Sequence, residues 1–146
     1  MNRSKKIWIA LGILALVLVL IVALVWGGRL FVARQKRLVL ATGPTEDALG
    51  LAEGRVRILA FSSADCTQCH TLQQPALRRL QALRGDEIDV VEIDAPGSPD
   101  LAKRYRILTV PSTVVLNAAG EALAINYGFA NLNKLQQQID AVLALA

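Results

Sequence analysis

Hydrophobic residues divide the chain into one uninterrupted apolar segment and a longer region in which apolar and polar positions alternate at short spacing. The uninterrupted segment runs from Ile7 to Trp26, 20 residues without a charge and with a single glycine. A helix of that length is about 30 Å long, which is roughly the hydrocarbon thickness of a bilayer. The pattern predicts a single-pass membrane helix over residues 7–26, in contact with lipid.

The flanks of this segment favour a retained anchor over a core helix or a cleaved signal peptide. Trp8 and Trp26 lie near its ends, where indole rings prefer the headgroup level, and basic residues lie outside both. The segment is too long and too uniformly apolar for an ordinary core helix, and residues 27–35 contain no convincing small-x-small cleavage site. We expect an anchor and tether over residues 1–36, with the tether either continuing the helix or linking it to the next unit.

Beyond the tether, the pattern predicts strands and helices in alternation. A strand at 55–61 is continuously apolar in its second half, as expected for a central strand covered on both faces. Apolar residues at helical spacing then predict a helix over 67–83, and a strand follows at 87–94, which makes a right-handed βαβ unit with parallel strands. Upstream of this unit, we expect a short strand at 37–41 and a turn with one or two helical turns at 44–54.

The remaining sequence predicts a short helix, a hairpin and a final helix. Ser98, followed by proline and aspartate, has the composition of a helix start. The segments 112–117 and 121–127 predict an antiparallel hairpin, and Asn131 is placed to cap a helix with apolar residues three and four apart. Together these elements predict an α/β fold with a mixed central sheet and flanking helices, in a domain spanning residues 37–146.

The net charge of +4 belongs to the membrane segment. Residues 1–36 contain six basic residues and no acid, whereas the other 110 contain ten basic and all twelve acidic residues. No nucleic-acid-binding motif accompanies the basic residues, and we expect no nucleic-acid partner. Because basic residues lie on both sides of the apolar segment, the positive-inside rule gives almost no asymmetry. The expected extracytoplasmic position of the domain follows from the usual orientation of N-terminal anchors alone.

The two cysteines, Cys66 and Cys69, lie in the stretch DCTQCH at 65–70 and are compatible with several kinds of site. C-x-x-C-H is the attachment motif of a c-type haem, but His70 and Met1 are the only histidine and methionine, and small cytochromes are mainly helical. A structural zinc site needs four ligands, and no second Cys or His pair is present. Both alternatives are weaker than redox chemistry, and we expect no metal and no cofactor.

The placement of the cysteines favours thiol chemistry over two structural cysteines. Cys66 follows the strand at 55–61 and falls at or beside the N-terminal turn of the predicted helix, where unpaired backbone N–H groups and the helix dipole stabilise a thiolate. Cys69 comes one turn later, within reach to resolve a mixed disulfide. This spacing therefore predicts a reactive dithiol.

Residues 37–146 resemble the thioredoxin family. The resemblance rests on the strand followed by C-x-x-C (ILAFSSADCTQC), VVEID at the end of the next strand, TVPSTVVL with Pro111, the NAAGE hairpin, and Gly128 before the last helix. These motifs together are far more specific than C-x-x-C alone, and the resembling region makes up about three quarters of the chain.

The resemblance implies roles for particular residues. Cys66 would be the attacking thiolate and Cys69 the buried resolving thiol, with a Cys66–Cys69 disulfide in the oxidised form. Pro111 matches the family's cis-proline, which would bring the backbone of Val110 beside the disulfide to pair with an extended substrate strand. The implied partners are cysteine-containing protein substrates and a membrane or soluble redox partner.

The chain departs from housekeeping thioredoxins at two positions near the resolving cysteine. Ala60 replaces the buried acid that helps to deprotonate this thiol in the family. Pro75 resembles the proline that kinks the active-site helix, but it comes one residue later than usual.

Four further residues beside the cysteines are expected to modulate their reactivity: Asp65, Thr67, Gln68 and His70. Asp65, where tryptophan is usual, opposes thiolate formation at Cys66, whereas the helix start and a protonated His70 favour it. Thr67-Gln68 replaces the Gly-Pro of housekeeping reductases. A destabilised thiolate makes the dithiol a better reductant and a stabilised one makes the disulfide a better oxidant. These opposing effects leave open whether the pair reduces or oxidises its substrates.

We therefore expect a membrane-anchored thiol–disulfide oxidoreductase. The alternative is a non-catalytic thioredoxin-like module that binds an extended peptide in the groove beside Pro111. The departures at Ala60 and Asp65 keep this alternative open.

Overall fold

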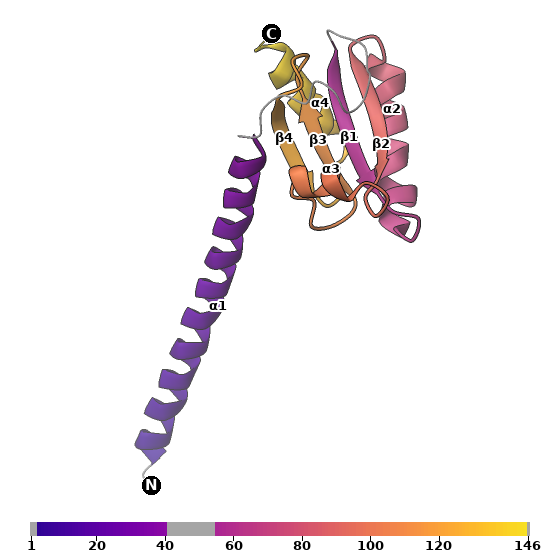
Figure 1. Cartoon of the computed structure of the whole chain (residues 1–146). Helices are drawn as coiled ribbons and strands as arrows, with labels where there is room; N and C mark the ends of the chain where they lie inside the picture. The colour runs from indigo at the N-terminus through magenta and orange to yellow at the C-terminus, as the bar shows by residue number, and fades with distance from the viewer. Residues whose placement is uncertain (1–2, 41–54, 146) are drawn as a thin grey trace. The chain divides into compact units, whose positions relative to one another are not determined.

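The computed structural model describes residues 3–40 and 55–145 of the 146-residue chain. The chain divides into two units, Met1–Gln35 and Lys36–Ala146. The first consists of one long helix, and the second contains a sheet with helices on its faces (Figure 1).

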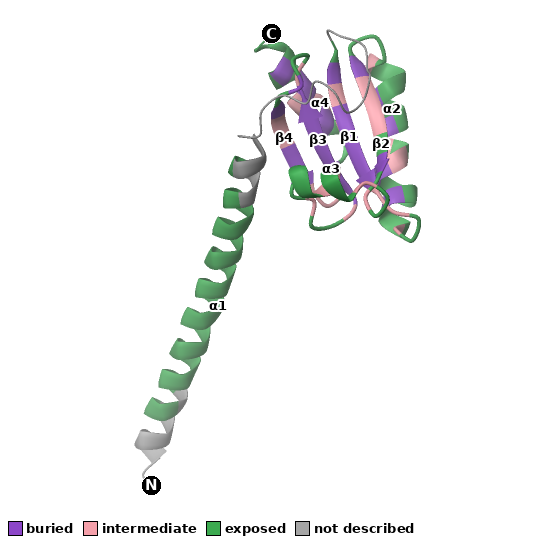
Figure 2. Cartoon of the chain, in the orientation of Figure 1, coloured by how far each residue is buried: buried purple, intermediate pink, exposed green. Residues whose placement is uncertain are grey.

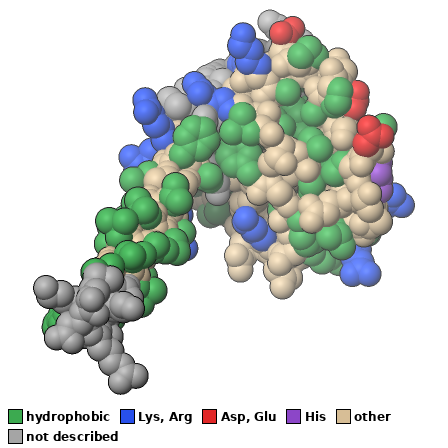
Figure 3. Space-filling view, turned by 90° about the horizontal axis from the view of Figure 1, so that it is seen from below, with side chains coloured by type: hydrophobic (Ala, Val, Ile, Leu, Met, Phe, Trp, Pro, Cys, Tyr) green, Lys and Arg blue, Asp and Glu red, His purple; other side chains and the backbone are tan. Residues whose placement is uncertain are grey.

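The long helix, α1 (Arg3–Leu40), has 38 residues. Between Leu11 and Arg34 it is long and apolar enough to cross a membrane, with a mean hydropathy of 2.8 and no buried residue. Its described residues are exposed in Figure 2, and hydrophobic side chains cover much of its surface in Figure 3. The predicted apolar helix is present and extends through the expected tether.

The strand predicted at 37–41 is wrong, because α1 continues to Leu40. Once a helix has formed, each further residue adds a backbone hydrogen bond at little cost, and arginine and leucine are good helix formers. The consecutive helix breakers Gly43 and Pro44 come only later in the sequence. The short helix predicted at 44–54 lies outside the described residues.

Four strands form a mixed sheet in the order β2-β1-β3-β4. β1 (Val56–Ser62) and β2 (Ile88–Asp94) are parallel, whereas β3 (Ser112–Leu116) is antiparallel to β1 and to β4 (Ala122–Tyr127). The predictions of these strands and of the mixed sheet are confirmed, with ends that differ by a residue. β1 has a strand on either side, which agrees with its continuous run of apolar residues.

Three helices flank the sheet: α2 (Gln74–Arg84), α3 (Pro99–Arg104) and α4 (Leu132–Leu143). A π-helical turn, η1 (Cys69–Gln73), precedes α2 and was not predicted. Asn131 caps α4 as expected, since its side-chain oxygen accepts a hydrogen bond from the Lys134 N–H at 2.9 Å. Ser98 precedes α3 as expected, but its side chain makes no capping hydrogen bond.

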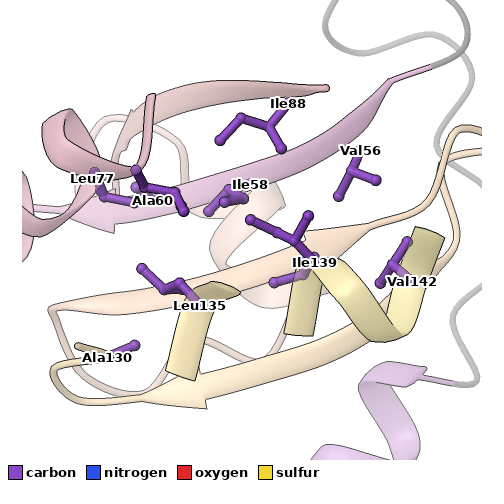
Figure 4. Packing of buried hydrophobic residues seen from close by; sticks show 11 residues of the cluster. Val56, Ile58, Ala60, Leu77, Ile88, Ala130, Leu135, Ile139 and Val142 are labelled. Carbon is purple, nitrogen blue, oxygen red and sulfur yellow. The ribbon is translucent and has the colours of Figure 1, made fainter. Parts of the chain in front are cut away.

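Apolar side chains form one cluster on each face of the sheet. The first cluster joins β1 to α2 and α4 and includes Ile58, Ala60, Leu77, Leu80, Leu135 and Ile139 (Figure 4). The second includes Leu59, Phe61, Tyr105 and Val114. Successive strand residues point to opposite faces, so β1 contributes to both clusters. Each fully buried leucine or isoleucine side chain stabilises the fold by about 1.5–3 kcal/mol.

The sheet brings two loops together at one end. β1 ends at Ser62, shortly before the cysteines, and β3 begins at Ser112, directly after Pro111. The two strands are antiparallel neighbours with Phe61 opposite Ser112. The loop after β1 and the loop before β3 therefore emerge side by side.

Candidate active site

Cys66 and Cys69 lie where β1 gives way to the first helical turn, and they are joined by a disulfide. Cys66 is partly exposed, whereas Cys69 is only 1% exposed. The Cys69 N–H donates a hydrogen bond to Cys66 Sγ at 3.1 Å. In the reduced pair, such a donor stabilises negative charge on the sulfur that accepts it. The pair thus combines one accessible sulfur that has a backbone donor with one protected sulfur.

The loop before β3 contains a cis peptide bond between Val110 and Pro111. The Pro111 carbonyl accepts a hydrogen bond from the Gly128 N–H at 2.8 Å. Gly128 has a φ of +86°, a backbone conformation that glycine adopts readily because it has no Cβ. Pro111 and Cys69 line the same small recess. The structure therefore brings the predicted proline segment beside the disulfide.

Asp65, Thr67, Gln68 and His70 lie exposed around the cysteine pair. The His70 ring donates from Nε2 to the Ala64 carbonyl at 3.1 Å, and its side chain is visible at the surface in Figure 3. This bond ties the first helical turn to the loop that carries Asp65. Because exposed charges are screened by water and salt, we expect a modest effect of these side chains on Cys66.

The π-helical turn η1 explains why Pro75 comes one residue late. In this turn the Gln74 N–H donates to the Cys69 carbonyl, five residues earlier, so the turn holds one residue more than an α-helical turn. Pro75 then falls in the first turn of α2, where its missing N–H is tolerated. The extra residue is absorbed directly after Cys69, and π-turns of this kind are frequent at functional sites.

Gln73 is a site residue that the sequence pattern did not reveal. Its side chain is buried, with Nε2 donating to the Ala130 carbonyl at 3.2 Å and Oε1 accepting from the Ala130 N–H at 2.9 Å. These two bonds fasten the end of η1 to the segment before α4. The available signal was spacing, because Cys69, Gln73, Leu77 and Leu80 form one buried stripe at helical intervals.

Glu92 is a second residue that the sequence pattern missed. It lies on β2 directly opposite Ala60 of β1, the position at which the resemblance implies a buried acid. Gln74 Nε2 donates to Glu92 Oε2 at 3.3 Å. Glu92, Gln74, Ala60 and Cys69 line the same recess. A carboxylate is therefore present near the resolving cysteine, but on the neighbouring strand.

The side-chain arrangement suits thiol chemistry. In the described ranges, 3–40 and 55–145, no group of three or more His, Cys, Asp or Glu side chains is placed to hold a metal ion. An accessible sulfur bonded to a buried one can instead exchange its disulfide with an external thiol.

Comparison with known proteins gives concordant matches. The family described as TraF, F plasmid transfer operon protein, matches residues 32–140, about three quarters of the chain. Thioredoxin of Bacillus subtilis (strain 168) is 28% identical over 75 residues, which are 51% of this chain and 70% of the relative.

Solved structures give the same result for the fold. Thioredoxin-2, a component of the malaria parasite protein secretion machinery, has a TM-score of 0.59 at 21% identity, over 68% of this chain and 93% of that one. Oxidised mitochondrial thioredoxin 3 of Saccharomyces cerevisiae has a TM-score of 0.53 at 25% identity, over 60% and 79% of the two chains. The predicted thioredoxin-like fold is confirmed.

Proposed function

We propose that this chain, which belongs to the TraF family and has a thioredoxin-like fold, is a membrane-anchored thiol–disulfide oxidoreductase that acts on cysteines of other proteins. One observation carries the proposal: the disulfide joins a partly exposed Cys66, which accepts a backbone hydrogen bond at its sulfur, to a buried Cys69. A purely structural disulfide has no need of this asymmetry, whereas an exchanging pair does.

The reaction proceeds through a mixed disulfide. In the reducing direction, the Cys66 thiolate attacks one sulfur of a client disulfide, and the other client sulfur leaves as a thiolate. Cys69, once deprotonated, attacks Cys66 Sγ, which closes the Cys66–Cys69 bond and releases the second client sulfur. Two electrons pass from the dithiol to the client disulfide, and oxidation of a client dithiol is the same sequence in reverse.

The client backbone is proposed to bind beside the Val110–Pro111 bond. Pro111 lies next to Cys69 at the recess and Val110 is partly exposed. An extended client segment would add to the backbone there, in the manner of a strand added to a sheet edge. Cysteine-containing proteins are the substrates that this arrangement suits.

The exposed side chains around the pair are proposed to adjust its reduction potential modestly, and a separate redox partner is proposed to supply or remove electrons. Asp65, Thr67, Gln68 and His70 surround the pair and would tune the stability of the Cys66 thiolate. The helix α1 is proposed to span the membrane with the catalytic domain outside the cytoplasm. A redox partner in the membrane or in solution would then exchange electrons with the Cys66–Cys69 pair.

Insulin reduction tests this function directly. The full chain in detergent micelles, supplied with dithiothreitol, is expected to accelerate the precipitation of insulin B chain, and Cys66→Ser is expected to lose that acceleration. Cys66→Ser keeps the size of the side chain and removes the nucleophile. Equal rates for the two proteins would reject the catalytic function and favour a non-catalytic peptide-binding module, the reading that Ala60 and Asp65 support.

A further inference from the structure

Cys69 is the reacting group that depends most on its surroundings. Its side chain is 1% exposed, and the recess that it lines includes the apolar side chains of Phe61, Leu77 and Pro111. Burial among apolar groups disfavours a thiolate, yet the thiolate is the form that attacks a disulfide. To resolve a mixed disulfide, Cys69 must therefore give its proton to a nearby acceptor.

The recess beside Cys69 has the size and polarity for one bridging water. Its volume is about 10 Å³, close to the least that accommodates a water molecule. Gln73, Gln74 and Glu92 line it together with the apolar side chains. The Gln73 amide is bonded to Ala130, so the partners for a water here would be the Cys69 thiol, the Gln74 amide and the Glu92 carboxylate, within the two to four that a buried water requires.

Glu92 is the carboxylate that lines this recess. It lies opposite Ala60, which faces Leu77 of α2 in the cluster of Figure 4. Ala60 also lines the recess, and its small side chain leaves space there. The hydrogen bond from Gln74 Nε2 holds Glu92 Oε2 at 3.3 Å. Because Glu92 is exposed, it can exchange protons with solvent while it lines a recess shared with a buried thiol.

The other charged groups near Glu92 are engaged elsewhere. Arg78 of α2 donates from Nη2 to Gln74 Oε1 at 3.4 Å, so it binds the same Gln74 amide whose Nε2 donates to Glu92. Asp94, the next residue on the same side of β2, accepts a backbone N–H of the following turn at 2.9 Å. His70 and Asp65 are exposed and do not line the recess. Among the described residues that line the recess, Glu92 is the only ionisable side chain besides Cys69.

We propose that Glu92 takes the Cys69 proton, through one water in the recess, when Cys69 resolves a mixed disulfide; this rests on the function proposed above. The Cys69 thiol gives its proton to the water, which passes a proton to the Glu92 carboxylate. The resulting thiolate attacks Cys66 Sγ, the Cys66–client bond breaks, and the client sulfur leaves with the bonding electrons. In the reverse direction, protonated Glu92 returns the proton as Cys69 leaves.

Reaction with 5,5′-dithiobis(2-nitrobenzoate) separates the two steps. The reduced full chain in detergent releases one thionitrobenzoate when Cys66 attacks the reagent and a second when Cys69 displaces the first adduct. At neutral pH, Glu92→Gln is expected to leave the first phase unchanged and to slow the second by about 100-fold, the lower range of general acid–base effects. Glu92→Asp, which keeps a carboxylate, is expected to restore part of that rate.

The pH profile and a matched variant complete the test. The deficit of Glu92→Gln should persist at about pH 8.5, the ordinary pKa of a cysteine, and shrink only at higher pH, because burial disfavours the Cys69 thiolate and hydroxide must then replace the carboxylate as the proton acceptor. Glu121→Gln removes the same charge near the β3–β4 turn, at the opposite end of β3 from Pro111, and should change neither phase. A normal second phase in Glu92→Gln, or equal slowing of both phases, overturns the role of Glu92. A parent protein without a fast first phase instead overturns the proposed function.

Discussion

At the residue scale, single side chains fix the cysteine pair in place through bonds to the backbone. Gln73 satisfies both backbone groups of Ala130, and the His70 ring reaches back to the Ala64 carbonyl. A buried amide left without partners costs about 1–3 kcal/mol, so the paired Gln73 amide stabilises the fold while it positions the end of η1. The resolving cysteine is therefore held from two sides, by its own helix and by the segment before α4.

Tyr127 gives a residue-scale prediction for stability against pH. Its hydroxyl is buried and has no hydrogen-bond partner among the described residues. Desolvation raises the pKa of Tyr127 above its usual value, and the charge of Arg106 lowers it in part. A phenol with a raised pKa in the folded state keeps its proton after the unfolded chain has lost it. Its contribution to stability is therefore present below pH ~10 and is lost as pH rises above that value.

Tyr127→Phe should remove this part of the alkaline destabilisation. Urea unfolding of the oxidised chain, followed by circular dichroism, should give a shallower loss of stability above pH ~10 than in the parent. At neutral pH, the variant should be as stable as the parent or more stable by up to ~1 kcal/mol, because it buries no unpartnered hydroxyl. The disulfide keeps both cysteines from titrating. If the free energy of unfolding falls equally with pH in Tyr127→Phe and in the parent, the prediction is contradicted.

At the scale of elements, η1 is an insertion that leaves the buried face of α2 unchanged. Deletion of Thr71, an exposed residue whose hydroxyl bonds only to the nearby Thr67 carbonyl in the described contacts, should convert the π-turn to an α-turn. Leu77 and Leu80 would stay in the core, and we expect a loss of about 1–2 kcal/mol. Deletion of Ala76 within α2 is the control. It rotates both leucines by about 100°, away from the core, and should cost about 3–6 kcal/mol.

Thermal unfolding of the two deletion variants distinguishes them. The variant without Thr71 should keep a cooperative transition a few degrees below that of the parent, whereas the variant without Ala76 should lose most of its transition. Similar losses in both variants would mean that η1 is an integral part of α2 and not an inserted residue.

The same elements explain how far the sequence alone could lead. Periodicity located β1 to β4, α2 and α4, because those elements bury regular stripes. Start signals alone located α3, which has no buried residue. The hydrophobic pattern gave the wrong element at 37–41. Arginine and leucine are compatible with strand or helix, and the preceding helix α1 continues through this segment to Leu40. In the site, the C-x-x-C motif and Pro111 could be recognised from the sequence. The contributions of Gln73 and Glu92 depend on which backbone group or strand lies opposite, and that is a tertiary property.

At the scale of the whole molecule, the helix α1 is longer than the hydrocarbon core of a bilayer is thick. A 38-residue helix extends about 57 Å, whereas the hydrocarbon core is about 30 Å thick. If Ile7–Trp26 lies within the hydrocarbon, the part of α1 that follows continues as a helix through the headgroup region. Arg29 and Arg34 then lie where basic side chains are stable, beside phosphates or in water. We propose residues 1–36 as this anchor and residues 37–146 as the catalytic domain.

The charges that flank the apolar segment do not decide the orientation of the proposed anchor. Arg3, Lys5 and Lys6 precede the apolar segment, and a similar number of basic residues follows it. Domains cross membranes largely regardless of their charge, so the slightly acidic residues 37–146 are free to be on either side. We expect residues 37–146 on the extracytoplasmic side, where cysteine pairs meet oxidised clients and disulfides persist.

Thiol labelling of Cys66 tests the orientation. A Cys69→Ala variant keeps Cys66 as the only cysteine. Brief reduction with a membrane-impermeant phosphine, followed by a polyethylene-glycol maleimide, should shift its mass in intact spheroplasts as fully as after lysis. A shift that appears only after lysis would place the domain in the cytoplasm. In that case the reducing glutathione pool would keep the pair largely as a dithiol, and reduction of clients would become the favoured direction.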